Sequence, residues 1–228
     1  MVNAQLSAMT DYPFTRLAGL LKDVQPPAGA TLNLAVGEPQ RPPPPMIARI
    51  LADHAAQWGR YPPATGTAEF REIVAGWLTR RYRLPEGAID PDRAVLPVQG
   101  TREALFQIAT VVAADSDDRR TAVLVPNPSY ATYAAAGRLA GADVVPLAAR
   151  RDAGFLPALD RLEPDLLRRT ALVYLCTPSN PEGAVADLAY LKQAIGIARE
   201  YGFVLAVDEC YAEIWDRAPS GTVDCTME

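Results

Sequence analysis

The sequence predicts an α/β fold built on a mainly parallel sheet. From residue 94 onward, short apolar runs alternate with amphipathic stretches of helical length, an order that is typical of right-handed βαβ units. The chain has 228 residues, of which 49% are hydrophobic and 21% are charged, so it can bury a sizeable core. Four of the apolar runs end in turns that are polar or contain glycine, and ligands of open α/β sheets bind at such strand ends.

The N-terminal region is rich in proline and is predicted to be largely irregular. Within residues 1–45, a short helix is expected over Pro13–Leu21 and a short strand over Leu32–Val36. Apolar side chains then recur at helical spacing, which predicts helices over Met46–Trp58 and Ala68–Tyr82. The alternation of strands and helices is expected to begin only after these two helices.

Residues 94–207 supply the expected sheet and the helices that cover it. Apolar runs rich in branched side chains mark the strands, and helical periodicity marks the segments between them. The predicted strands are Ala94–Val98, Ala122–Val125, Asp143–Leu147, Ala171–Cys176 and Phe203–Val207. The predicted helices are Thr101–Ala114, Tyr130–Ala140, Ala158–Leu167 and Asp187–Tyr201.

Composition and charge argue against several classes of protein. The net charge is −5 and the two signs are mixed along the chain, so no basic groove for nucleic acid is expected. No apolar run approaches the ~20 residues of a membrane span, and the first residues lack the pattern of a signal peptide. Three cysteines without a CxxC pair favour a reduced, cytoplasmic protein with Cys176 in its core. The single histidine, His54, cannot build a metal site, so no metal is expected.

Two carboxylates, Asp208 and Glu209, follow the apolar run Phe203–Val207. A carboxylate at the end of a buried strand is costly to bury unless a cation pairs with it. Three interpretations fit Asp208. It holds a metal ion, as in the Walker B strand of an ATPase, it binds a protonated pyridine nitrogen, or it caps the turn after the strand. The turns that follow the other strands have to distinguish among them.

A glycine turn after the Ala94–Val98 run is suited to bind an anion. Gly100 lets the backbone approach closely, and a helix that begins at Thr101 offers free N–H groups with a positive end. This signal is weak by itself, because a glycine before a helix is more often only a turn. The sequence contains no GxxxxGK[ST] motif, which argues against the ATPase interpretation of Asp208.

Three further side chains follow strands of the same predicted sheet. Tyr130 comes after the rigid turn Pro126–Ser129 and offers a flat ring for stacking, although a core or surface tyrosine is the simpler interpretation. Asn180, in a proline-rich turn, offers an amide, and Tyr211 offers a phenol three residues after Asp208. Together with the glycine turn, these groups meet the requirements of a planar, phosphorylated, cationic heterocycle, and pyridoxal phosphate matches each of them.

Six motifs, in matching order and spacing, carry a resemblance to a known family. They are Val36–Pro39, Tyr61–Gly66, Pro97–Leu105, Pro126–Tyr130, Thr177–Gly183 and Asp208–Ile214. With these motifs the sequence resembles the fold-type I pyridoxal-phosphate-dependent aminotransferases of class I/II. The opening run Tyr12–Leu17 and the Asp208–Ile214 motif are most similar to bacterial N-succinyl-L,L-diaminopimelate aminotransferases. The resemblance implies the three-layer sandwich of the aspartate-aminotransferase-like fold.

The resemblance also implies which residues would hold the cofactor ring. Asp208 would pair with the pyridine N1–H and keep it protonated, so that the ring can act as an electron sink. Asn180 and Tyr211 would bind the phenolic oxygen of the ring by hydrogen bonds. Tyr130 would stack on the ring.

Other positions would serve the phosphate and the substrate. The backbone N–H groups of Gly100 and Thr101 would hold the phosphate, and Tyr61 would reach the phosphate of the partner subunit in the family dimer. Gly37 would lie against the substrate α-carboxylate. Glu182 departs from the family, which often has threonine at that position.

The implied activity is amino transfer between glutamate and N-succinyl-2-amino-6-oxopimelate in lysine and diaminopimelate biosynthesis, by a cytoplasmic homodimer acting on amino acids and 2-oxo acids. Two alternatives stay open. The chain is an inactive fragment or pseudogene product, or it is a transaminase or β-lyase of the same fold with another amino-acid substrate. No nucleic-acid or membrane partner is expected.

The resemblance places the Schiff-base lysine of the family beyond Glu228, so no catalytic residue is assigned and the chain by itself is expected to be inactive. Lys22 and Lys192, the two lysines of the sequence, do not match that position. Residues 1–45 would form the N-terminal arm and part of the small domain, and residues 46–228 the N-terminal part of the large cofactor-binding domain, so the chain is expected to be truncated. Two later strands of the family would lie between Phe203–Val207 and Ala94–Val98, and their loss would leave Ala94–Val98 without neighbours.

Overall fold

The computed structural model describes residues 4–9, 12–26, 28–29, 37–38, 41–113, 120–215 and 218–225. Their centre is a four-stranded sheet in which every strand pair is parallel, in the order β2-β1-β3-β4. The strands are β1 (Ala122–Asn127), β2 (Asp143–Ala148), β3 (Thr170–Cys176) and β4 (Val204–Asp208). Four of the five predicted strands are therefore confirmed to within one or two residues.

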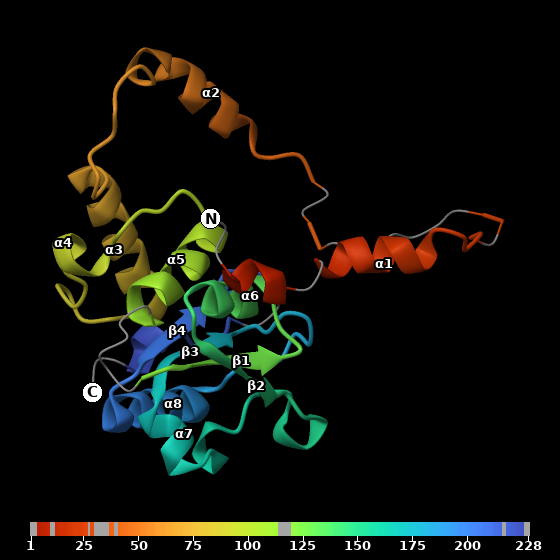
Figure 1. Cartoon of the computed structure of the whole chain (residues 1–228). Coiled ribbons are helices and arrows are strands. Elements are labelled where there is room, and N and C mark those ends of the chain that lie inside the picture. The colour runs from red at the N-terminus through yellow and green to blue at the C-terminus, as the bar shows by residue number, and fades with distance from the viewer. Residues whose placement is uncertain are drawn as a thin grey trace.

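Helices cover both faces of this sheet. The α-helices are α1 (Pro13–Leu21), α2 (Pro45–Asp53), α3 (Ala68–Tyr82), α4 (Pro91–Ala94), α5 (Thr101–Ala113), α6 (Ala131–Leu139), α7 (Pro164–Arg168) and α8 (Leu188–Tyr201). Short 3₁₀ helices are η1 (Ala4–Ala8), η2 (Ala55–Gln57), η3 (Arg151–Ala153), η4 (Leu159–Arg161) and η5 (Thr222–Cys225). In Figure 1, α5 and α6 lie above the sheet and α7 and α8 below it, so the predicted three-layer α/β fold is confirmed.

Local sequence signals fix both ends of α8. The side chain of Asp187 accepts a hydrogen bond from the backbone N–H of Tyr190 at 2.8 Å, which caps the start of α8. Gly202 ends that helix with a φ of 70°, a conformation that glycine adopts without a steric penalty. The chain can therefore turn directly from α8 into β4.

The core lies on the two faces of β3, whose seven residues are all buried. On one face, Leu124, Val173 and Leu175 pack against α7 and α8. On the other, Tyr133 from α6 packs against Leu172 and Tyr174. Burial of this apolar surface is the main force that holds the layers together.

The predicted strand Ala94–Val98 is wrong in the structure. Ala94 ends the short helix α4, and the residues after it form no sheet ladder, although Val95 has an extended backbone with φ −122° and ψ 118°. Extended backbone becomes a strand only when a neighbour supplies hydrogen bonds. Both edges of β1 are occupied by β2 and β3, and within the described residues nothing pairs with the outer edge of β4. This is the consequence that the family resemblance implied.

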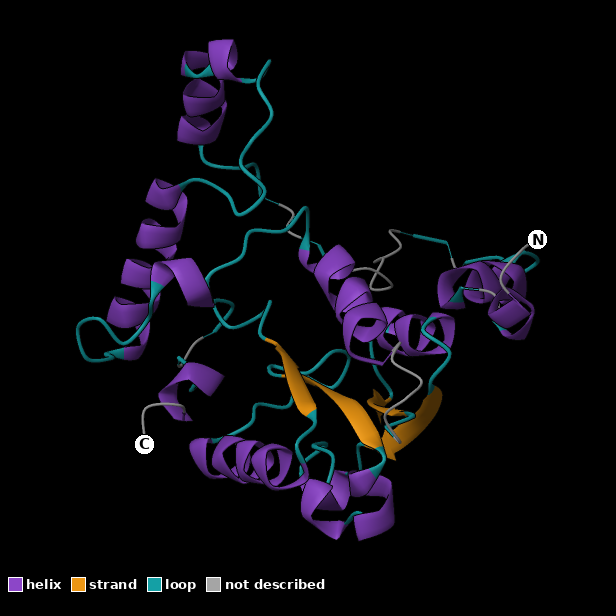
Figure 2. Cartoon of the chain, turned by 60° about the vertical axis from the view of Figure 1, so that its left-hand side comes forward, coloured by secondary structure: helices purple, strands orange, loops and turns teal. Residues whose placement is uncertain are grey.

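The N-terminal helices lie away from the sheet. Figure 1 shows α1 and α2 projecting from the body, and in Figure 2 α2 is again the topmost helix, far from the orange strands. The apolar residues that were predicted to lie on one helix do lie on α2, but Ile47, Ile50 and Leu51 are exposed. The predicted strand Leu32–Val36 lies outside the described residues, and the division into two domains stays a prediction. Among the helices of the described part, none is long and apolar enough to cross a membrane.

Candidate functional site

A cleft of about 580 Å³ opens at the carboxyl ends of the strands. Its walls come from the start of α5, the turn before α6, the turn after β3, the end of β4 and the N-terminal segment. The lining residues used below are Gly37, Thr101, Arg102, Tyr130, Tyr133, Asn180, Asp208, Cys210 and Tyr211. The volume is in the range of ~300–1,000 Å³ that is usual for small-molecule sites.

Asp208 is the buried carboxylate of this cleft. Parallel pairing of β3 and β4 places it opposite Cys176, at the last residue of β4. One carboxylate oxygen accepts the hydroxyl proton of Tyr133 at 2.7 Å, and the other accepts the backbone N–H of Cys210 at 3.1 Å. In the described part of the chain no cation pairs with Asp208. A carboxylate that is only 9% exposed and lacks a cation is a candidate partner for a cationic ligand.

The glycine turn before α5 has a backbone conformation that favours glycine. Gly100 has a φ of 152°, which residues with a side chain rarely adopt, and its carbonyl oxygen accepts the N–H of Ala104 at 3.2 Å. Thr101 is the first residue of α5 and lines the cleft. The free N–H groups of the first helical turn therefore begin at the cleft wall, which suits an anionic group.

Tyr130 and Arg102 connect two walls of the cleft. The Arg102 Nε–H donates to the Tyr130 hydroxyl at 2.7 Å, and this hydrogen bond raises the pKa of the guanidinium. Tyr130 immediately precedes α6, so its ring is held between the start of α5 and the start of α6. The ring that was predicted to stack is therefore placed in the cleft by a contact with α5.

Asn180 and Tyr211 meet across the cleft although they are 31 residues apart. The Asn180 amide Nδ2 donates to the Tyr211 hydroxyl at 3.2 Å. Burial raises the pKa of Tyr211. The hydroxyl and amide groups can therefore act together on one polar atom of a ligand.

Two thiols lie beside Asp208. Burial, and then the charge of Asp208, raises the pKa of Cys176 to about 11 and that of Cys210 to about 12. Both thiols are therefore protonated at neutral pH and are poor nucleophiles. The prediction that Cys176 is a core residue is confirmed, because it is buried at the end of β3.

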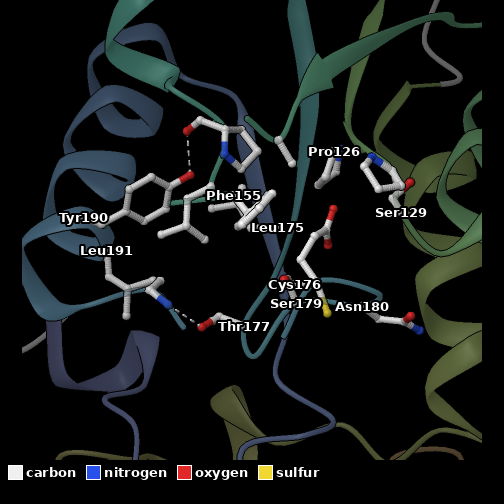
Figure 3. A pocket seen from close by; sticks show the side chains of 16 residues that line it. Pro126, Ser129, Phe155, Leu175, Cys176, Thr177, Ser179, Asn180, Tyr190 and Leu191 are labelled. Carbon is white, nitrogen blue, oxygen red and sulfur yellow. Dashed lines mark hydrogen bonds between the residues drawn. The ribbon is translucent and has the colours of Figure 1, made fainter. Parts of the chain in front are cut away.

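A second, smaller pocket lies behind the turn that carries Asn180 (Figure 3). It shares Pro128, Ser129 and Asn180 with the cleft, but its volume of about 10 Å³ holds at most about one water molecule. Its wall is fixed by two hydrogen bonds, from the Ala186 N–H to the Thr177 hydroxyl at 2.9 Å and from the Tyr190 hydroxyl to the Pro157 carbonyl at 2.8 Å. This pocket supports the Asn180 turn and is too small for a cofactor.

The structure brings most of the predicted site residues together. Gly37, Thr101, Tyr130, Asn180, Asp208 and Tyr211 all line the cleft, with Gly100 adjacent to Thr101. Tyr61 does not line it and is fully exposed, so its predicted contact with a partner subunit is untested. The roles of all these residues in binding stay predictions.

Sequence reasoning missed Tyr133 and Arg102 as side chains of the site. Arg102 stood inside a quoted motif without a role. Tyr133 follows Tyr130 by three residues, a spacing that places two helical side chains on the same face, and this signal could have identified it. Neither Lys22 nor Lys192 lines the cleft.

A parallel sheet with helices on both faces and a ligand cleft beyond its carboxyl ends defines an α/β protein with a small-molecule site. The chain belongs to the family described as "Aminotransferase class I and II", whose model matches residues 30–223. It is 32% identical over 223 residues to LL-diaminopimelate aminotransferase of Moorella thermoacetica, an alignment that covers 95% of this chain and 55% of that protein.

The solved structures that this chain resembles include other aminotransferases. An aminotransferase from Neisseria meningitidis superposes with a TM-score of 0.90 at 33% identity, over 98% of this chain and 57% of that one. A probable N-succinyldiaminopimelate aminotransferase from Thermus thermophilus gives a TM-score of 0.70 at 28% identity, over 83% of this chain and 50% of that one. The chain therefore spans a little over half the length of the relatives that it matches.

Proposed function

We propose that the cleft binds pyridoxal 5′-phosphate and that this chain forms the cofactor-binding part of an aminotransferase. The observation that carries the proposal is Asp208, a buried carboxylate that has hydrogen-bond donors but no cation in the described part of the chain. A pyridinium N–H supplies both the missing positive charge and a further donor. The competing ATPase interpretation has no support, because the sequence has no P-loop motif.

The other residues of the cleft fit the same ligand. Gly100 and Thr101 would hold the phosphate through backbone N–H groups, and the φ of 152° at Gly100 makes the turn depend on glycine. Tyr130 would face the flat ring, and Asn180 with Tyr211 would bind its phenolic oxygen. When bound, pyridoxal phosphate supplies the electron sink that stabilises negative charge at the substrate α-carbon.

The proposed parent reaction transfers an amino group between glutamate and N-succinyl-2-amino-6-oxopimelate, with 2-oxoglutarate as the returning keto acid. The names of the relatives support a diaminopimelate-related substrate, and the N-terminal motif supports the succinylated form. Gly37, which lines the cleft, is proposed to lie against the substrate α-carboxylate. A cytoplasmic homodimer, in which Tyr61 reaches the phosphate of the partner subunit, completes the proposal. Other amino-acid substrates, including those of a β-lyase, remain the alternative within the fold.

A second candidate is that the 228-residue chain binds the cofactor without turnover. One observation favours it, because neither of its two lysines lines the cleft. The lysine that anchors the cofactor is also the proton carrier in the family chemistry, so transamination should be lost without it.

Cofactor binding is tested by equilibrium dialysis with pyridoxal 5′-phosphate, using Asp208→Asn and the matched control Asp143→Asn. Asp143 is exposed and pairs with Arg169 on the surface at 2.7 Å. A hydrogen bond to a charged group is worth about 1.5–3 kcal/mol, so Asp208→Asn should weaken binding about 10- to 100-fold while the control is unchanged. Equal affinities for Asp208→Asn and the unmodified chain would refute the proposed site.

Turnover is tested separately with glutamate and N-succinyl-2-amino-6-oxopimelate, by measuring 2-oxoglutarate formation. The chain of 228 residues should give none, and measurable production would reject the second candidate. A chain extended to the length of its relatives, assayed on a panel of amino acids, distinguishes the succinylated substrate from free diaminopimelate and from β-lyase substrates.

A further inference from the structure

Tyr133 is the side chain in closest described contact with the Asp208 carboxylate. It lies in the first turn of α6, is completely buried, and donates its hydroxyl proton to the Asp208 carboxylate at 2.7 Å. This contact joins α6 to β4, between residues that are 75 positions apart in the sequence. Nothing in the family motifs quoted above assigns a role to this tyrosine.

The ring of Tyr133 is held in one position by two other tyrosines. It stacks on Tyr174 of β3 with ring centres 4.7 Å apart and an angle of 8°. The ring of Tyr130 meets it edge to face at 5.8 Å. Because Tyr174 is itself tied to the Leu105 carbonyl by a 2.6 Å hydrogen bond, the Tyr133 hydroxyl has little freedom to leave Asp208.

The Tyr133 hydroxyl is always a donor in this site. Burial, together with the neighbouring Cys176 and Asp208, raises its pKa, so it does not ionise at physiological pH. Neutral donors of the described residues therefore reach both oxygens of Asp208, this hydroxyl on one and the Cys210 N–H on the other. A neutral donor withdraws electron density from a carboxylate without cancelling its charge, so the carboxylate stays available for a cation.

We propose that Tyr133 is a positioning residue for the cofactor site, which fixes the Asp208 carboxylate and limits how strongly it holds the proton of a bound pyridinium. This inference rests on the proposed cofactor. Loss of the hydroxyl has two consequences that a packing role would not produce together. The carboxylate loses its fixed orientation, which weakens binding, and it becomes more basic, which keeps the ring nitrogen protonated to higher pH.

The change with pH can be assigned to Tyr133 and Asp208 only if the ionisation of the neighbouring side chains stays the same. They are Cys176 and Tyr174 on β3, Glu182 in the turn after β3, Cys210 and Tyr211 after β4, Tyr130 before α6 and Arg102 on α5. The raised pKa values of about 11 for Cys176 and about 12 for Cys210 keep both thiols neutral in the neutral range. The Arg102 guanidinium, whose pKa is also raised, stays charged.

The test compares Tyr133→Phe with the control Tyr190→Phe, both in the 228-residue chain. The Tyr190 hydroxyl also bonds a partner at 2.8 Å, the Pro157 carbonyl, but has no contact with Asp208. Pyridoxal 5′-phosphate affinity is measured by dialysis at several pH values, and folding is checked by urea unfolding. Tyr133→Phe should weaken binding about tenfold and move the alkaline loss of affinity to higher pH, while Tyr190→Phe changes neither.

A double variant keeps the test decisive. In the Asp208→Asn background, Tyr133→Phe should have no further effect on affinity, because the hydroxyl acts through the carboxylate. The inference is overturned if Tyr133→Phe binds as the unmodified chain does with the same pH profile, or if its effect persists in the Asp208→Asn background. If the unmodified chain binds no pyridoxal 5′-phosphate, the proposed function fails first and this inference falls with it.

Discussion

Gly100→Ala tests the turn that is proposed to hold the phosphate. The φ of 152° at this position is a conformation that is essentially reserved for glycine, and a non-glycine residue there costs about 1–3 kcal/mol. The new Cβ would lie 2.4 Å from a Glu103 carboxylate oxygen, but this is the end of a flexible side chain that can rotate away. The backbone strain therefore decides the effect, and the turn should relax by moving the start of α5.

The movement should affect binding as well as folding. A shift at the start of α5 reorients the free N–H groups of Gly100 and Thr101, which act on an anion only at hydrogen-bonding distance. We expect Gly100→Ala to lower the free energy of unfolding by about 1–3 kcal/mol in urea titration and pyridoxal 5′-phosphate affinity by at least about tenfold in dialysis.

Gly141→Ala is the matched control. Gly141 has a φ of 80° and open space where a Cβ would be added, and it lies after α6, away from the cleft lining. It should show comparable backbone strain without any loss of binding. The reasoning would be refuted if both variants lost stability equally and Gly100→Ala still bound pyridoxal 5′-phosphate with unchanged affinity.

Two further predictions concern stability. Burial and the Asp208 charge raise the pKa of Cys176 from its ordinary 9.0 to about 11, so the folded chain keeps a proton that the unfolded chain loses. Cys176 should therefore lower the free energy of unfolding by about 2 kcal/mol between pH 9 and 11 in urea titrations, and an equally steep fall in Cys176→Ala would contradict this. Glu209 accepts the Thr222 N–H at 2.8 Å and the Tyr82 hydroxyl at 3.3 Å, which ties the segment 218–225 to α3. Glu209→Gln should cost about 1–2 kcal/mol and speed limited proteolysis of that segment, and an unchanged cleavage rate would count against the contact.

The sequence was most informative where a local pattern has one structural solution. The bounds Ala68–Tyr82 were predicted correctly because apolar periodicity, the Thr67 cap and a charged last turn agree with one another. The strand Ala171–Cys176 was equally clear, since a short apolar run between polar turns becomes a central parallel strand when helices flank it. In both elements the deciding forces act within a few residues.

Prediction was less successful where the outcome depends on neighbours. Val95 is extended, as its sequence suggests, but no described strand pairs with it, so Ala94–Val98 is not a strand. The stripe of α2 is amphipathic, yet Ile47 and Leu51 are exposed in the structure. The spacing of apolar residues shows which surface a helix or strand can bury. Only the fold decides whether another element packs on that surface.

The sequence by itself determined the order of strands and helices, the glycine turn at Gly100 and the carboxylate at Asp208, because these features follow from local residue preferences. Only the tertiary structure decided how they meet. Parallel pairing brings Asp208 to the same edge as Asn180, and the packing of α6 on β3 aims the Tyr133 hydroxyl at that carboxylate. The contact between α6 and β4 spans 75 residues, and no local preference encodes a distance of that kind.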